Sequence, residues 1–329
     1  VSAFGQTAAE KAVVDRWMKT LTPSQRIAQL IVVRTHGNTG GARSREWRNI
    51  VSWINQTHVG GIIVVNRVRR GGVVKAQPHE TSGFINRLQK MSRLPLIVGG
   101  DFERSVSMRF DGTIAYPHAM AYGAANDPAL TKELGRLTVR EARALGFQWV
   151  FAPDADVNNN PDNPIIRGKR RSFSADPGVV ARHAAAFVRA HRERGVLTCA
   201  KHFPGHGSAR GDTHLGLVNV TTTWNETELE PFRTLVAAGL ADMIMTAHVF
   251  NARLDPDRPA TLSSRVVTGI LRGHLAFDGV VVSDDMEMRA ISSAYGLEES
   301  VPAAVEAGID LLCFGNNLTY DPDIAPRAA

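Results

Sequence analysis

The chain has 329 residues, of which 43% are hydrophobic and 21% are charged, and its formal net charge is +6. This balance is typical of a soluble globular protein with one large domain or two modest ones. No apolar run approaches the ~20 residues that a membrane helix needs, so we expect no membrane span. The basic clusters lack interleaved aromatic residues and any nucleic-acid-binding motif. We therefore expect a solvated basic surface that binds no nucleic acid.

The two cysteines, Cys199 and Cys313, each lie in an apolar, strand-like run. This placement predicts buried free thiols rather than a disulfide. The sequence begins at Val1, and small residues alternate near its start, as in the remnant of a removed signal peptide. This pattern favours an exported or periplasmic location over a cytoplasmic one.

Short apolar runs alternate with amphipathic helical patterns along the chain. The runs are continuous rather than alternating, which is typical of parallel strands that are covered on both faces. They occupy residues 27–33, 61–65, 95–99, 149–152, 196–200, 242–246, 280–283 and 309–314. The helical patterns between them occupy residues 46–57, 128–145, 178–194, 226–238, 263–275 and 298–307.

Eight strands with intervening helices predict an α/β fold, a (β/α)8 barrel that forms one catalytic domain over residues 1–329, with residues 1–20 as an N-terminal helix or tail. A doubly wound sheet is the alternative, and it would gather its ligand at one switch point. Here polar residues follow six different strands: Asp101, Glu103, Asp154, Asp156, Lys201, His202, His248, Asp284, Asp285, Asn316 and Asn317. That spread favours the barrel. Little sequence remains after the eighth strand, so either part of the last helix is lacking or the chain continues beyond residue 329.

The segment KHFPGHGSARGDTHLG, from Lys201 to Gly216, allows three interpretations. A metal site would use His202, His206, Asp212 and His214. Their spacing fits no rigid metal motif, and Lys201 would repel a cation. A phosphate loop needs its lysine after the glycines, whereas Lys201 precedes them. In the third interpretation Asp212 orients His214, which then gives and takes a proton near neutral pH. An ordinary polar loop remains the alternative to this last one.

A barrel mouth lined with carboxylates, arginines, a lysine and histidines suits a polyhydroxylated substrate, and aspartates in different surroundings can divide catalytic roles as glycosidases require. At this point the sequence resembles the β-N-acetylglucosaminidase branch of glycoside hydrolase family 3. KHFPGHG followed by DTH is specific to that branch, and FAPDADVNNNPDNPII, RSF, MTAHV and GVVVSDDMEM match further family stretches in order. The resemblance covers nearly the whole chain and implies a (β/α)8 barrel.

The resemblance also implies a retaining double displacement. Asp284, rather than the adjacent Asp285, matches the nucleophile, and His214 matches the acid/base, with Asp212 behind it. Five residues match positions that hold the sugar, and one matches a pocket-lining position: Asp101, Arg109, Arg171, Lys201 and His202, and then His248. Simpler structural roles are an ion pair for Glu103, loop fixation for His206 and backbone positioning for Asp154 and Asp156.

Two departures from the family pattern concern the rim of the site. The family has Asp-x-Glu-Gly-Gly-x-Val-x-Arg after the third strand, whereas this chain has DFERSVSMR, with Arg104 and Ser105 in place of the glycines. The stretch IIRGKRRSF is about two residues longer than the corresponding stretch of the family pattern, so Arg170 could take the role of Arg171.

We therefore expect a retaining exo-β-N-acetylglucosaminidase that acts on cell-wall-derived or chitin-type glycosides through a covalent glycosyl-aspartate. The expected partner is a carbohydrate, and we expect a monomer without cofactor or metal. The alternatives are a β-glucosidase or a glycoside phosphorylase on the same barrel, a metal-dependent hydrolase, and a sugar-binding barrel that has lost catalysis.

Overall fold

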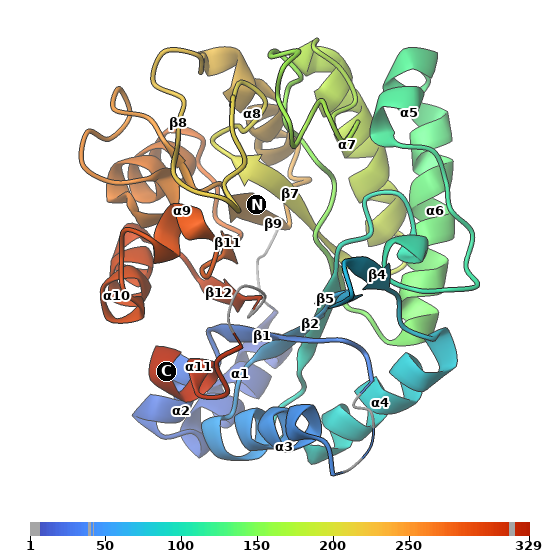
Figure 1. Ribbon diagram of the computed structural model, residues 1–329, viewed down its shortest axis with the longest axis vertical. Helices are drawn as coiled ribbons and strands as arrows, with labels where there is room; N and C mark the ends of the chain where they lie inside the picture. The colour runs from blue at the N-terminus through green and yellow to red at the C-terminus, as the bar shows by residue number, and fades with distance from the viewer. Residues whose placement is uncertain (1–6, 39–40, 42, 316–319) are drawn as a thin grey trace.

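Eight parallel strands close into a barrel in the order β1-β12-β11-β9-β7-β6-β5-β2 (Figure 1). The computed structural model describes residues 7–38, 41, 43–315 and 320–329. The barrel strands are β1 (Ile31–Thr35), β2 (Gly61–Val64), β5 (Ile97–Gly100), β6 (Trp149–Val150), β7 (Leu197–Phe203), β9 (Met243–Thr246), β11 (Val280–Asp285) and β12 (Leu311–Phe314). All eight predicted strands are present. Because the first strand pairs with both the second and the last, the sheet has no open edge and the doubly wound alternative is excluded.

One helical segment follows each barrel strand and covers its outer face (Figure 1). These segments are α3 (Arg45–Ser52), α4 (Pro78–Met91), α6 (Pro128–Leu145), α7 (Pro177–Arg192), α8 (Glu230–Ala237), the π-helix η5 (Arg265–His274), α10 (Leu297–Ala307) and α11 (Ile324–Ala328). The last of them is five residues long. The helix α4 was not predicted, although its buried side chains recur at helical spacing.

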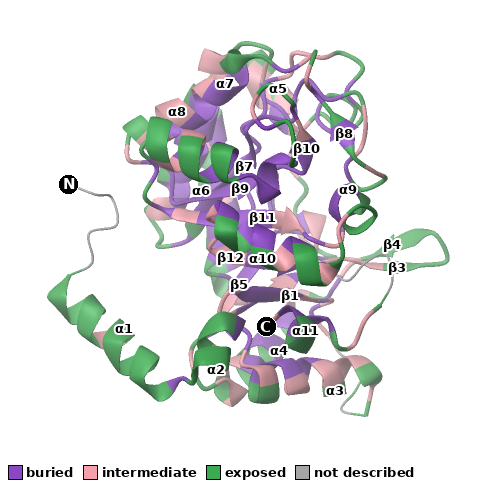
Figure 2. Cartoon of the chain, turned by 90° about the vertical axis from the view of Figure 1, so that its left-hand side faces the viewer, coloured by how far each residue is buried: buried purple, intermediate pink, exposed green. Residues whose placement is uncertain are grey.

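Further elements lie outside this frame. The additional helices are α1 (Ala8–Thr20), α2 (Pro23–Ala28), η1 (Trp53–Thr57), η2 (Val106–Met108), α5 (Ala119–Ala125), η3 (Glu226–Leu229), η4 (Ala260–Leu262) and α9 (Arg289–Ser292). The short strands are β3 (Arg67–Arg69), β4 (Gly72–Val74), β8 (Val218–Asn219) and β10 (Val249–Phe250). Figure 2 shows the β3–β4 hairpin extending beyond the barrel on one side and α1 lying away from it on the other. No residue of α1 is buried.

The helix α6 illustrates how local sequence sets an element's ends. The Asp127 carboxylate accepts a hydrogen bond from the Ala129 N–H (2.9 Å), and Pro128 occupies the first turn, where a missing N–H costs nothing. Gly146 ends the helix with a φ of +96°, which a residue without Cβ adopts freely. These signals explain why the predicted bounds of this helix match the observed ones.

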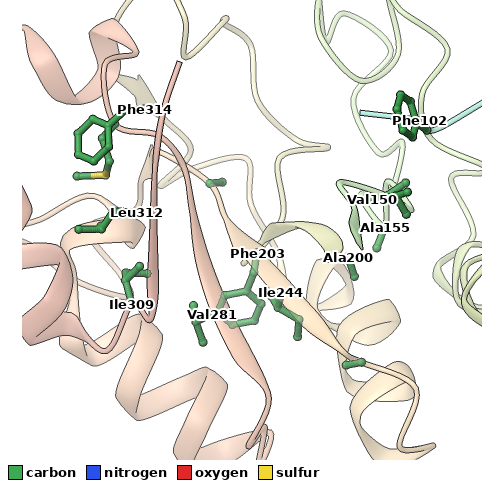
Figure 3. Packing of buried hydrophobic residues seen from close by; sticks show 14 of the residues in the cluster. Phe102, Val150, Ala155, Ala200, Phe203, Ile244, Val281, Ile309, Leu312 and Phe314 are labelled. Atoms are coloured by element: carbon green, nitrogen blue, oxygen red, sulfur yellow. The ribbon is translucent and has the colours of Figure 1, made fainter. Parts of the chain in front are cut away.

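Two apolar layers hold the barrel together. The interior layer contains Val32, Trp149, Phe151, Cys199, Met243, Met245, Val282 and Cys313. The outer layer lies between strands and helices, and Figure 3 shows part of it, including Phe203, Ile244 and Val281. Both cysteines are buried and free, as predicted. The Trp149 indole fills the interior so closely that a Cβ at Gly99 would lie 1.8 Å from its Nε1.

Within the described residues, no helix has both the length and the apolar character to cross a membrane.

Candidate active site

A cavity of about 870 Å³ lies where the barrel strands reach their carboxyl ends, which is where (β/α)8 enzymes carry their active sites. Its walls contain every residue that the resemblance matched to a catalytic or sugar-holding position: Asp101, Arg109, Arg171, Lys201, His202, Asp212, His214 and Asp284. These side chains come from four strands and the loops that follow them. The barrel therefore brings together residues as much as 183 positions apart in the sequence, from Asp101 to Asp284.

A buried ion network forms the floor of this cavity. The Lys201 ammonium, only 3% exposed, lies 2.8 Å from Asp101 Oδ1 and 3.0 Å from Glu103 Oε1. Arg109 pairs with the second oxygen of Asp101 (2.5 Å), and Arg171 pairs with Glu103 (2.7 Å). Burial alone would raise the pKa of both carboxyls, but these cations outweigh it and hold each pKa well below its usual value. Asp101 and Glu103 are therefore ionised.

Glu103 and Arg171 take the roles that the sequence left open. Glu103 forms the predicted ion pair, and its partner is Arg171, which donates through both Nε and Nη2. The Arg171 Nη2 also lies 3.4 Å from His202 Nε2. Arg170, in contrast, is exposed at the rim. Of the two candidate arginines, Arg171 is thus the one that faces the sugar-holding residues.

Asp156 positions the histidines of KHFPGHG. Its Oδ2 accepts a hydrogen bond from His202 Nδ1 (2.7 Å), and its Oδ1 accepts one from the His206 backbone N–H (2.7 Å). Asp156 is fully buried, and its pKa is lowered because these two histidines outweigh the effect of burial. The His202 ring is consequently fixed with Nε2 directed toward Arg171.

The two adjacent aspartates at the end of β11 have different environments. Burial raises the pKa of Asp285 to about 6, and its Oδ1 is occupied by the N–H groups of Glu287 (3.0 Å) and Gly315 (2.8 Å). Burial alone would also raise the pKa of Asp284. Three nearby histidines outweigh it and leave that pKa below its usual value: His202, His248 and His214. Asp284 thus has the lower pKa of the pair and is ionised over a wider pH range.

His248 differs from the sequence-based expectation. It is fully buried and does not line the cavity. Its Nε2 lies 2.9 Å from the Asp285 carbonyl, and its Nδ1 lies 2.8 Å from Thr261 Oγ1. The ring therefore supports the backbone that follows Asp284 from behind. A sequence match to a pocket position cannot distinguish a side chain that faces the cavity from one that backs its wall.

The loop after β7 has a fixed base and an exposed tip. Residues 201–209 are buried, and a Cβ at Gly207 would lie 1.7 Å from the Val157 carbonyl oxygen, so only glycine fits there. At the tip, His214 Nδ1 lies 2.7 Å from Asp212 Oδ1, which forms the predicted pair, and the His214 side chain is 62% exposed. The base of the loop is thus held by packing, and only its tip is exposed to solvent.

The loop after β5, which departs from the family pattern, keeps a backbone conformation that glycine adopts more readily than other residues. Ser105, which replaces a family glycine, has a φ of +123°, a region that costs a residue with a side chain about 1–3 kcal/mol. Its hydroxyl donates to the Ile114 carbonyl (2.8 Å) and pairs with Ser107 Oγ (2.6 Å), which offsets part of that cost. Arg104 lines the cavity beside it.

One group among the described residues could offer ligand atoms to a metal: Asp154, Asp156 and His202. Its chemistry does not suit a cation, because Arg171 Nε lies 3.4 Å from Asp154 Oδ2 and Asp156 already binds His202. Burial and the adjacent Asp156 raise the pKa of Asp154. The metal set considered from sequence is not assembled either, since His206 faces Thr213 and His214 lies at the exposed tip.

No sequence pattern indicated a second charged cluster, of which Arg34, His36 and Arg67 line the cavity. Glu46 accepts from His36 Nδ1 (2.8 Å) and from Arg67 Nη2 (2.7 Å), and Arg34 Nη1 lies 2.5 Å from His36 Nε2. Burial would raise the pKa of Glu46, but His36 and Arg67 lower it to about 2. Arg34 lies in β1, Glu46 lies in α3, and His36 and Arg67 follow the first two strands, so no local pattern indicates that they meet. Asn316 and Asn317, expected after the eighth strand, lie outside the described residues.

Comparison with known proteins agrees with this geometry. Residues 22–324 match the family described as "Glycosyl hydrolase family 3 N terminal domain". The chain is 34% identical over 265 residues to a β-hexosaminidase of Tolumonas auensis, and the match covers 79% of this chain and 76% of that protein. It is similar in structure to a family 3 β-N-acetylglucosaminidase of Paenibacillus sp. (TM-score 0.82, 37% identity, 94% of this chain and 57% of that one). It is also similar in structure to a β-N-acetylhexosaminidase of Beutenbergia cavernae (TM-score 0.82, 30% identity), and the match covers 94% of this chain and 90% of that one.

The site and these likenesses define a glycoside hydrolase. The chain belongs to glycosyl hydrolase family 3.

Glu228 beneath the loop base makes the stability of the protein pH-dependent. It is fully buried, and burial raises its pKa from 4.5 to about 7. Because the Glu228 carboxyl holds its proton more tightly in the folded protein than in the unfolded chain, the protonated carboxyl stabilises the folded state at pH values below its pKa in the unfolded chain. That stabilisation is lost as the pH rises through about 7. We expect Glu228→Gln to match the wild type in urea unfolding at pH 5 and to exceed it by on the order of 2 kcal/mol at pH 8. The exposed Glu226→Gln is the matched control, and parallel stability curves for Glu228→Gln and the wild type would contradict the prediction.

Proposed function

We propose that this protein is a retaining exo-β-N-acetylglucosaminidase. The observation that carries the proposal is the pairing of two groups at one cavity, an ionised aspartate at the end of β11 and an aspartate-oriented histidine on the loop after β7. A carboxylate nucleophile and a separate proton donor are what a double displacement requires. The names of the Tolumonas and Paenibacillus relatives support N-acetylglucosamine rather than glucose as the sugar.

In the first step, an Asp284 carboxylate oxygen attacks the anomeric carbon while the bond to the leaving oxygen breaks. His214 donates the Nε2 proton to that oxygen. Asp212 accepts the Nδ1–H at 2.7 Å, fixes the tautomer and stabilises the imidazole ring. The product is a glycosyl ester of Asp284 together with the free alcohol.

In the second step, His214 removes a proton from water, and the resulting hydroxide oxygen attacks the same anomeric carbon. The ester bond breaks and the Asp284 carboxylate is regenerated. Two inversions at one carbon give net retention of configuration. The cations of the ion network donate to the sugar hydroxyls and hold the ring in place during both steps.

Charge at the rim favours a cell-wall-derived substrate over a chitin-type one. Arg104, Lys169 and Arg170 line the cavity and have no carboxylate partner among the described residues. Burial lowers the pKa of the adjacent His118, and Arg104 and Arg170 lower it further, which places both cations near one point. A carboxylate-bearing aglycone would complement this charge, whereas neutral chitin oligosaccharides offer it nothing.

The reaction class is tested by comparing aryl β-N-acetylglucosaminide with aryl β-glucoside. We expect turnover of the first at least about tenfold above the second, and a loss of at least about 10³-fold in Asp284→Asn, because the variant has no nucleophile. The products are examined by NMR, with and without inorganic phosphate. Preference for the glucoside, an inverted product, sugar 1-phosphate as the main product, or an active Asp284→Asn would each overturn the proposal.

The role of His214 is tested by varying the leaving group. His214→Ala should leave glycosylation by 2,4-dinitrophenyl N-acetylglucosaminide nearly unchanged, because that phenolate departs without a proton, and should slow a 4-methylphenyl substrate by about 10²–10⁴-fold. Stopped-flow measurement should show a burst of dinitrophenolate followed by slow deglycosylation. His79→Ala, on the exposed face of α4, is the control. Equal losses on both substrates would exclude His214 as the acid/base.

The aglycone preference is tested with two disaccharides, N-acetylglucosamine linked β-1,4 to N-acetylmuramic acid and N,N′-diacetylchitobiose. The double variant Arg104→Gly/Arg170→Gln should lose about tenfold in kcat/KM on the carboxylate-bearing disaccharide and little on chitobiose, since only the former meets the rim cations. Arg167→Gln, in the same loop but outside the cavity wall, is the control. An unchanged ratio of the two rates would show that the rim does not select the aglycone.

A further inference from the structure

Thr213 is the buried point of an otherwise exposed loop tip. It lies between Asp212 and His214 and is 3% exposed, whereas the His214 side chain is 62% exposed. Within residues 210–217, all of which the structure describes, it is the single buried residue. The loop tip is therefore attached to the protein body through the residue that separates the members of the Asp212–His214 pair.

Two polar contacts hold Thr213. Its Oγ1 lies 3.3 Å from His206 Nε2, and its carbonyl accepts a hydrogen bond from the Ala290 N–H (3.1 Å). Ala290 belongs to α9, which follows the β11 strand that ends at Asp284 and Asp285. The loop tip is thus tied both to its own base and to the segment that comes after the nucleophile.

His206 is itself immobile. Its backbone N–H donates to Asp156 Oδ1 (2.7 Å), and its carbonyl accepts from Asn163 Nδ2 (2.7 Å). The ring is 3% exposed, and burial lowers its pKa to about 4, so it stays neutral where Asp284 is ionised. A neutral, fixed imidazole can hold a hydroxyl without titrating over the working pH range.

We propose that Thr213 is a positioning residue, whose hydroxyl and carbonyl hold His214 over the bond to be cleaved. The same contacts connect the acid/base loop to the sugar-holding site, because Asp156 binds His202 with one carboxylate oxygen and the His206 backbone with the other. The inference rests on the proposed acid/base role of His214. It goes beyond that role by assigning the placement of the imidazole to a side chain that touches no substrate.

The hydroxyl has to be separated from the volume of the side chain. Thr213→Val keeps the shape and removes the hydrogen-bonding group, while Thr213→Ser keeps the hydroxyl and removes a methyl group. Thr213→Ala is a second hydroxyl-free variant in case the buried valine hinders folding. Thermal unfolding of each variant checks that the barrel is intact.

Each variant is assayed on 2,4-dinitrophenyl and 4-methylphenyl N-acetylglucosaminides. For Thr213→Val and Thr213→Ala we expect kcat/KM on the 4-methylphenyl substrate to fall about tenfold to a hundredfold, since a misplaced acid transfers its proton poorly. Glycosylation by the dinitrophenyl substrate should stay within about twofold of the wild type, and Thr213→Ser should restore both rates.

Three results overturn the inference: wild-type rates in the hydroxyl-free variants, equal losses on both substrates, or failure of Thr213→Ser to restore the rates. The His214→Ala variant is measured in parallel. If it shows the selective loss and Thr213→Val does not, the positioning role is wrong and the proposed acid/base survives. If His214→Ala loses both rates equally, the proposed acid/base is wrong and the positioning role falls with it.

Discussion

The buried charge of Lys201 is the constraint on which the active site depends. An ammonium at 3% exposure is stable only between carboxylates, and Asp101 and Glu103 supply them. Each of these carboxylates in turn binds an arginine, Arg109 or Arg171. Five side chains from three separate segments are thereby held together at the cavity. Removal of Asp101 or Glu103 would leave the buried Lys201 ammonium with one carboxylate partner fewer and an arginine without its partner.

Around this floor the site combines a buried part with an exposed part. The base of the loop after β7 is buried and bounded by Gly207 and Asp156, whereas its tip carries the His214 imidazole in solvent. Such a division lets the sugar-binding groups remain pre-organised while the proton-transferring group can still admit the substrate and release the product. The strained backbone at Ser105 belongs to the buried part, held by two hydroxyl contacts.

The strands and several helices could be predicted because their signals are local. Continuous apolar runs mark the eight strands, and Asp127 and Gly146 mark the ends of α6. The ion partners could not be predicted in the same way: Glu103 and Arg171 are 68 residues apart, and only closure of the barrel makes them neighbours. Residue matching placed His248 at the pocket, but the direction of its ring depends on Thr261 and Asp285, which no local pattern specifies.

The β3–β4 hairpin bears on how the protein resists aggregation at high concentration. It is a two-stranded ribbon whose strands pair with each other and not with the barrel, and its Val68 and Val73 are more than half exposed. Exposed valines beside unpaired strand edges are a template for intermolecular sheet formation. Arg69 and Arg70 at the turn act as gatekeepers, since charge repulsion opposes the approach of a second hairpin. The basic character of this segment therefore protects the protein's colloidal stability.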